Sequence, residues 1–138
     1  HLFLSGRRAP NTDRRPPGSP TYLLPDEEFL NELENRYGAG PHDLRDNEEM
    51  LSLVLPALRA DMEIHETYRY QPKSVLSCPI TAFAGEQDSR ITREELEGWQ
   101  LETTGAFRAR TFPGGHFYLH DHEEALVGEL RKDLVPAY

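Results

Sequence analysis

The chain is poor in cysteine, in positive charge and in long apolar runs. Its 138 residues include one cysteine, Cys78, which excludes an intrachain disulfide and a zinc site built from several cysteines. Lysine and arginine total 15 against 24 acidic residues, and the resulting net charge of −9 argues against nucleic-acid binding. No apolar run approaches the length of a membrane span. These absences predict a cytoplasmic protein that binds neither nucleic acid nor a membrane.

Several short motifs are also missing. Neither a Gly-x-Gly-x-x-Gly nor a Walker phosphate loop occurs, and no cofactor is expected. The nucleophile elbow Gly-x-Ser-x-Gly is absent as well. The first residues do not resemble a signal peptide. Because the chain opens at His1 inside an apolar run, we expect it to be a fragment or a processed piece of a longer protein.

The apolar pattern predicts an α/β fold with a parallel sheet. Short apolar or alternating runs are expected to form three strands, at 2–5, 80–84 and 107–112. Helical spacing with one apolar face is expected at 26–37, 46–65, 92–105 and 121–134. Strands that alternate with helices are typical of a parallel sheet with flanking helices.

The expected helix ends follow from short-range signals. Capping boxes, in which a cap residue precedes a glutamate by three positions, predict helix starts at Asp46 with Glu49, Thr92 with Glu95, and Asp121 with Glu124. Glycines are expected to end two helices, at Gly38 and Gly105. Pro56 is expected to kink or divide its helix. The last helix is expected to bury one stripe, made of Leu126, Val127, Leu130 and Leu134.

The segment between the first two expected strands is far longer than a simple crossover, which needs about a dozen residues. It therefore predicts a helical insertion at about 22–66, within one domain that covers 1–138. Such an insertion is either a lid over a substrate site or an ordinary extra helical layer. If it is a lid, the expected apolar wall consists of Phe29, Leu30, Leu33, Met50, Leu51 and Val54.

Two polar residues follow successive expected strands and suggest catalysis. Asp88 comes after the second strand and the turn Gly85-Glu86-Gln87, and His116 comes after the third strand and Pro113-Gly114-Gly115. A carboxylate followed by an imidazole, each at a strand end, matches the last two members of a Ser…Asp…His triad in α/β-hydrolase order. In this arrangement the carboxylate orients the imidazole, and the imidazole transfers protons. An Asp in a turn is also a common turn former, so the prediction depends on the pair.

Other nucleophiles and metals fit the sequence less well. None of the serines stands in an elbow context, and Cys78 is interpreted as a small core residue. His116, His120 and His122 lie close together, but their spacing matches no standard zinc pattern, and no metal is expected.

With these residues in place, the chain resembles the C-terminal half, or slightly more, of a type II thioesterase, the editing hydrolase of polyketide and nonribosomal peptide assembly lines. The resemblance is carried by the stretches 1–10, 24–30, 55–61, 78–83 and 112–117. It implies an α/β-hydrolase fold with a helical lid, in which the three strands are the last of a larger sheet. It assigns Asp88 as the triad acid and His116 as the triad base. The serine and the oxyanion donors would lie upstream of His1.

The resemblance also implies a reaction and a partner. The reaction would be hydrolysis of acyl thioesters on the phosphopantetheine arm of an acyl or peptidyl carrier protein, and the chain alone is expected to be inactive. An arginine-rich loop offers a docking surface for an acidic carrier, through Arg7, Arg8, Arg14 and Arg15. The alternative to docking is an ordinary solvated loop. The alternatives for function are a non-catalytic remnant or binding module, or another α/β-hydrolase esterase or acyltransferase.

Overall fold

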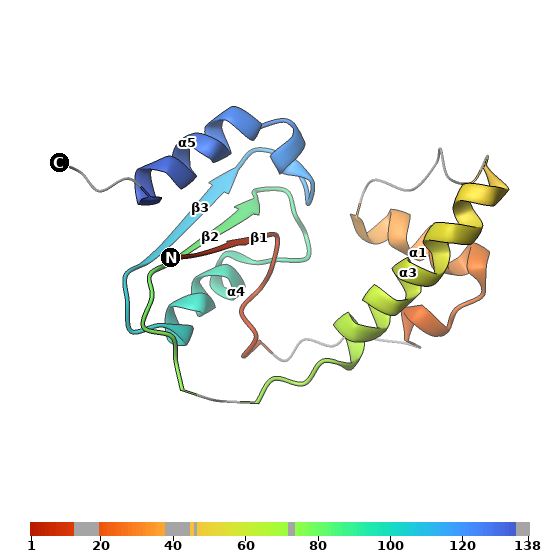
Figure 1. Ribbon diagram of the computed structural model, residues 1–138, viewed down its shortest axis with the longest axis horizontal. Coiled ribbons are helices and arrows are strands. Elements are labelled where there is room, and N and C mark those ends of the chain that lie inside the picture. The colour runs from red at the N-terminus through yellow and green to blue at the C-terminus, as the bar shows by residue number, and fades with distance from the viewer. Residues whose placement is uncertain (13–19, 38–44, 46, 72–73, 135–138) are drawn as a thin grey trace. The chain divides into compact units, whose positions relative to one another are not determined.

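The computed structural model describes residues 1–12, 20–37, 45, 47–71 and 74–134. The chain divides into two units, His1–Thr12 with Pro72–Tyr138, and Asp13–Gln71 (Figure 1). We call them the sheet unit and the helical unit, and each is described by itself. Across the described residues, no helix combines the length and the apolar character that a membrane crossing requires.

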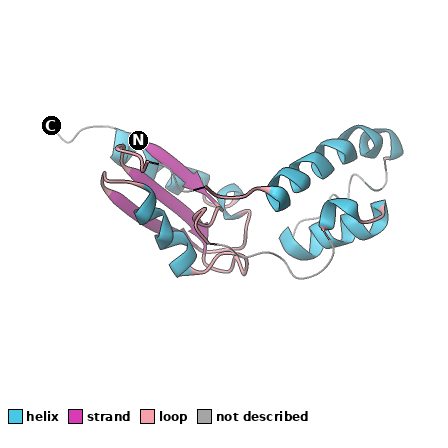
Figure 2. Ribbon diagram, turned by 90° about the horizontal axis from the view of Figure 1, so that it is seen from below, coloured by secondary structure: helices cyan, strands magenta, loops and turns pink. Residues whose placement is uncertain are grey.

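The sheet unit contains the three expected strands, β1 (Leu2–Ser5), β2 (Ile80–Gly85) and β3 (Phe107–Phe112). They lie side by side in the order β1-β2-β3, and both pairings are parallel (Figure 2). The predicted architecture, three parallel strands with flanking helices, is confirmed. Because the strands are parallel, their carboxyl ends meet at one edge of the sheet.

The central strand β2 is buried along its whole length, which explains why it reads as an uninterrupted apolar run. Its side chains alternate between two cores. Ala82 and Ala84 contact Leu96 of α4 (Arg93–Glu97) on one face. Phe83 packs on the other face with Phe112 and α5 (Glu123–Leu134). The two helices therefore cover opposite faces of the sheet (Figure 1).

The helix after β2 begins as predicted but ends early. The Thr92 capping box is present, with its side chain accepting from the Glu95 N–H and its N–H donating to the Glu95 carboxylate. The α-helix stops at Glu97 and continues as a 3₁₀ segment, η2 (Gly98–Glu102), so Gly105 does not end it. Trp99, at the junction between α4 and η2, donates its indole N–H to the Arg7 carbonyl at 2.8 Å. This bond and the glycine at position 98 favour the tighter turn.

The last helix differs from its prediction at both ends. It begins at Glu123, and Asp121 instead ends a 3₁₀ turn, η3 (Tyr118–His120). Of the expected stripe, Leu126 and Leu130 pack against the core, whereas Val127 and Leu134 are exposed. The end of the helix, which contains Leu134, meets the sheet through polar groups: Asp133 accepts from Arg108 of β3 at 2.7 Å and from Thr81 of β2 at 2.8 Å.

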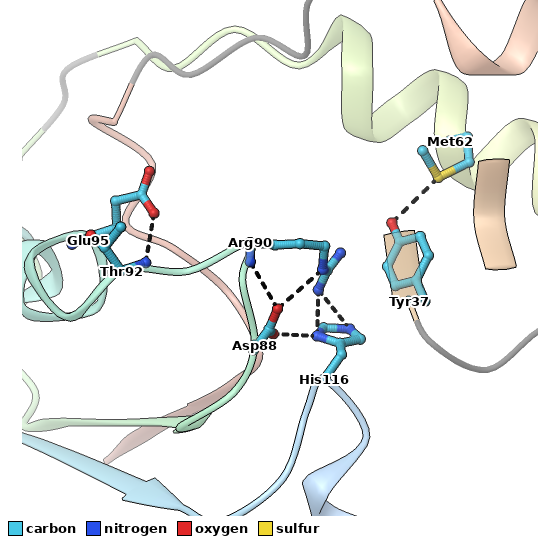
Figure 3. Close-up of polar contacts among 7 residues, drawn as sticks. All are labelled: Tyr37, Met62, Asp88, Arg90, Thr92, Glu95 and His116. Atoms are coloured by element: carbon cyan, nitrogen blue, oxygen red, sulfur yellow. Dashed lines mark hydrogen bonds and ion pairs between the residues drawn. The ribbon is translucent and has the colours of Figure 1, made fainter. Parts of the chain in front are cut away.

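The helical unit consists of η1 (Thr21–Leu23), α1 (Asp26–Tyr37) and α3 (Glu48–Thr67). The helices predicted within 26–66 are therefore present. Their shared core is made of Phe29, Leu30, Leu33 and Met62. Polar contacts join the elements around it. Arg59 lies over the Phe29 ring at 4.5 Å and pairs with Asp26 at 2.6 Å, and Tyr37 donates its hydroxyl to Met62 Sδ at 3.6 Å (Figure 3).

Helix α3 corrects two expectations. Its cap is Asn47, whose side chain accepts from the Met50 N–H at 3.0 Å; Asp46 lies outside the described residues, as does Gly38. Pro56 lies inside one continuous helix, so the expected division is wrong, while the alternative expectation of a kink stays a prediction. Proline removes one backbone hydrogen bond, but Leu55 and Leu58 on either side pack against the core with α1, and this packing keeps the helix continuous.

The residues expected to form a substrate wall lie in different environments. Phe29, Leu30 and Leu33 are buried in the core of the helical unit, where they contact one another and Met62. Leu51 is half-buried against the same core, Val54 is half-buried, and Met50 is exposed. A wall role for these side chains stays a prediction, and it applies most directly to the residues that keep accessible surface.

Candidate active site

Asp88 and His116 meet beyond the carboxyl ends of β2 and β3. The His116 Nδ1 and Asp88 Oδ2 atoms are 2.8 Å apart, and the Asp88 side chain retains 2% of its accessible surface (Figure 3). The predicted geometry, with both side chains at one end of the sheet and within hydrogen-bond distance, is confirmed. The imidazole therefore donates Nδ1–H to a buried carboxylate, an arrangement that fixes its tautomer and orientation.

The two loops that carry this pair touch through their backbones. Gln87 donates its N–H to the Gly114 carbonyl at 2.9 Å, and its side-chain oxygen accepts from the Gly114 N–H. A Cβ at Gly85 would lie 2.1 Å from the Gly115 carbonyl oxygen. Glycine at position 85 is therefore a condition for the close approach of the loops, and so for the short distance between Asp88 and His116.

The end of β1 forms a third side of the site. Gly6 has a φ of +63°, and a Cβ there would lie 2.8 Å from His116 Cε1. Next to it, the Ser5 hydroxyl is 2.7 Å from the hydroxyl of Tyr118, a side chain that is fully buried. The turn after His116 is thus tied to β1, and the imidazole lies directly against the Gly6 backbone.

Arg90 completes the surroundings of the carboxylate. Asp88 Oδ1 accepts from the Arg90 backbone N–H at 3.1 Å and from its Nε–H at 3.3 Å. The Arg90 Nη2 atom also contacts both ring nitrogens of His116, with 2.9 Å to Nε2 (Figure 3). Each carboxylate oxygen of Asp88 therefore has its own partner, Oδ2 with the imidazole and Oδ1 with the arginine.

The electrostatics keep Asp88 ionised. Burial by itself raises the pKa of Asp88, but the hydrogen bonds from His116 and from the Arg90 backbone and the Arg90 charge outweigh it, so that the pKa is lowered. For Tyr118, burial raises the pKa, the Ser5 hydrogen bond opposes this, and the Asp88 charge raises it further. At neutral pH the site therefore places an ionised carboxylate and a neutral phenol near the His116 ring.

Several residues of this site were not predicted from the sequence. Gly6, Gln87 and Tyr118 reach the site through contacts between distant segments, and no local pattern marks them. Arg90 could have been predicted from its position, because a residue two positions after an Asp in a turn is well placed to donate its N–H to that carboxylate. The cation at that position could have been recognised as a partner of Asp88.

Other candidates lie apart from the pair. His120 and His122 contact the aromatic rings of Phe117 and Phe112, and the described residues contain no group of three His, Cys, Asp or Glu arranged for a metal. Cys78 is half-buried just before β2, at the opposite strand end from Asp88. Of the proposed docking arginines, Arg14 and Arg15 lie outside the described residues.

The parallel sheet, with an acid and a base at the carboxyl ends of successive strands, has the features of the α/β-hydrolase class. Comparison with known proteins identifies the family. A family model described as thioesterase domain matches residues 1–134. The chain belongs to this thioesterase family.

A relative and a solved structure that are both named thioesterases agree with this assignment. The chain is 38% identical over 134 residues to thioesterase PikA5 of Streptomyces venezuelae, covering 97% of the chain and 46% of that protein. It is 40% identical over 137 residues to a Brevibacillus parabrevis protein named linear gramicidin dehydrogenase LgrE, covering 97% and 51%. The type II thioesterase BorB of the borrelidin biosynthetic cluster superposes with a TM-score of 0.83 at 39% identity, covering 97% and 54%. The chain thus spans about half the length of the relatives that it matches.

Proposed function

We propose that this chain supplies the acid and the base of an editing thioesterase. Its substrates would be acyl thioesters on the phosphopantetheine arms of carrier proteins in polyketide or nonribosomal peptide synthesis. The observation that carries the proposal is the contact between Asp88 and His116. A buried carboxylate on Nδ1 leaves the lone pair of Nε2 to accept the proton, once the serine hydroxyl takes the place of the Arg90 Nη2 atom that contacts Nε2 at 2.9 Å. Membership in the thioesterase family, with relatives from these pathways, supports the choice of reaction.

In the proposed reaction His116 acts twice. Its Nε2 removes the proton from a serine hydroxyl as the serine oxygen attacks the thioester carbonyl, and His116 then protonates the departing pantetheine sulfur. Water attacks the resulting acyl-serine by the same proton transfers and releases the acid. Asp88, ionised at neutral pH, stabilises the imidazolium that forms in both steps. We assign the serine to a segment outside these 138 residues, because the sequence contains no Gly-x-Ser-x-Gly motif.

The partner and the substrate wall belong to the same proposal. An acidic carrier protein would dock near the arginine-rich loop that contains Arg7 and Arg8, and such attraction acts mainly on the association rate. The helical unit would act as the lid, with the accessible side chains of Met50 and Val54 among those facing the acyl chain.

The test is hydrolysis of an acyl-pantetheine thioester. The complete gene product that contains this chain should turn the substrate over, and its His116→Ala variant should lose about 10⁶-fold in kcat, because the base is essential to both steps. The 138-residue chain by itself should show no saturable turnover, since it lacks a positioned nucleophile. Turnover that survives His116→Ala in the complete protein would refute the assigned roles.

A further inference from the structure

The proposed mechanism assigns roles to Asp88 and His116 but none to the side chain of Arg90. This guanidinium contacts both members of the pair, through Nε to Asp88 Oδ1 at 3.3 Å and through Nη2 to the imidazole nitrogens. Its side chain retains 23% of its accessible surface, so the contacts are partly shielded from water. A charged donor in such a place has more influence on its partners than a fully solvated one.

The contribution of the Arg90 side chain can be separated from that of its backbone. The backbone N–H to Asp88 Oδ1 bond, 3.1 Å long, belongs to the turn and would exist with any residue except proline at this position. The Nε–H bond to the same oxygen exists only with arginine, because lysine has no donor at that point of its side chain. The side chain therefore adds a second donor to Oδ1 and a positive charge beside the carboxylate.

We propose that Arg90 is a positioning residue for the Asp88 and His116 pair: by holding Oδ1, it turns Oδ2 toward the imidazole and keeps the carboxylate in that orientation. Without this side chain, Oδ1 keeps only the backbone N–H of Arg90 as a donor. A carboxylate with one donor fewer rotates more easily about its terminal torsion, which has a broad energy profile, and loses alignment with Nδ1. The inference rests on the proposed function, since it assumes that this pair performs the proton transfers.

The test uses the complete gene product and three variants. Arg90→Ala removes the side-chain donor and its charge, and Arg90→Lys restores the charge without the Nε–H. Arg93→Ala is the matched control, because Arg93 lies nearby in sequence on α4 with 80% of its side chain exposed and pairs with Glu97. Steady-state hydrolysis of an acyl-pantetheine thioester gives kcat and KM, and thermal unfolding confirms that each variant is folded.

We expect Arg90→Ala to lower kcat about tenfold or more with KM unchanged, because the lost interaction supports the reacting groups rather than substrate binding. Arg90→Lys should fall between Arg90→Ala and the wild type, and Arg93→Ala should match the wild type. A kcat for Arg90→Ala equal to that of Arg93→Ala would overturn the proposal. If Arg90→Ala does not fold, Arg90→Lys decides: wild-type kcat in that variant would equally overturn it.

A second measurement does not depend on turnover. The Asp88 carboxyl carbon, followed by ¹³C NMR, should titrate at a higher pH in Arg90→Ala, because removal of the cation and its donor raises the pKa of the carboxyl. The other titratable groups beside Asp88 are His116, which lowers the pKa of Asp88, and Tyr118, whose own pKa is raised by the Asp88 charge; both are unchanged in the variant. An unchanged Asp88 titration would overturn the inference. Absence of thioester hydrolysis in the wild type would instead refute the proposed function.

Discussion

The sheet unit and the helical unit differ in how closely their parts are held. In the sheet unit, backbone meets backbone at Gly85 and Gly115, and hydrogen bonds join segments far apart in the sequence, such as Ser5 with Tyr118. The helical unit has a small core between α1 and α3, and large apolar side chains such as Leu53 and Ile64 remain exposed. The comparison indicates that the proton-transfer groups occupy the part in which backbones meet directly. The elements of the other part are joined by side chains, through a small apolar core and through polar pairs such as Arg59 with Asp26.

After the loss expected for His116→Ala, the largest effect is expected at the other member of the catalytic pair in the sheet unit. Asp88→Asn in the complete gene product should lower kcat about 10⁴-fold, because an amide at this position favours the wrong imidazole tautomer. The fold should remain intact, since asparagine has nearly the same shape. Thioester hydrolysis and thermal unfolding would check both statements, and a variant with near-normal kcat would show that Asp88 is merely a turn former.

The next largest effect is a loss of stability that we expect to be confined to the helical unit. Phe29→Ala removes a fully buried ring and is expected to lower local stability by about 3–5 kcal/mol. Amide hydrogen exchange should accelerate in α1 and α3 while the amides of β2 keep their protection. The control, Leu53→Ala, changes a side chain that is 70% exposed and should leave exchange nearly unchanged. Equal acceleration in β2 would mean that the two units unfold together and that the comparison fails.

The same contrast explains which features could be predicted from the sequence. The strands and α1 were predictable because burial on two faces or on one face leaves a periodic apolar pattern, as in β2. Asp88 and His116 were predictable from their order after two strands. Gly6 was not predictable as part of the site, because its contact with His116 joins opposite ends of the chain. The prediction of a helix start at Asp121 was wrong, because an Asp at this point of the sequence also suits the end of a 3₁₀ turn.

A smaller effect is expected from forcing the catalytic loops apart. In Gly85→Ala the new Cβ would meet the Gly115 carbonyl oxygen at 2.1 Å, so one of the two loops must move. A displacement of about 1 Å between reacting groups can cost about 10²-fold in rate, and kcat should fall by that order. The matched control is Gly128→Ala in α5, where nothing lies within 4 Å of the added Cβ. It should leave kcat unchanged and slightly raise stability.

The smallest expected effect concerns the start of α3. The Asn47 side chain accepts from the Met50 N–H at 3.0 Å, one of the amide groups that a helix leaves without a partner in its first turn. Asn47→Ala should therefore lower the stability of the helical unit by about 1 kcal/mol, measured as faster hydrogen exchange in the first turns of α3. Asn47→Asp keeps an acceptor at the cap and should restore most of the protection. Because the cap belongs to the helical unit, the ¹³C titration of Asp88 should be the same in both variants. A shift of that titration in Asn47→Ala would show that fraying of α3 reaches the acid and the base, and that the two units are coupled.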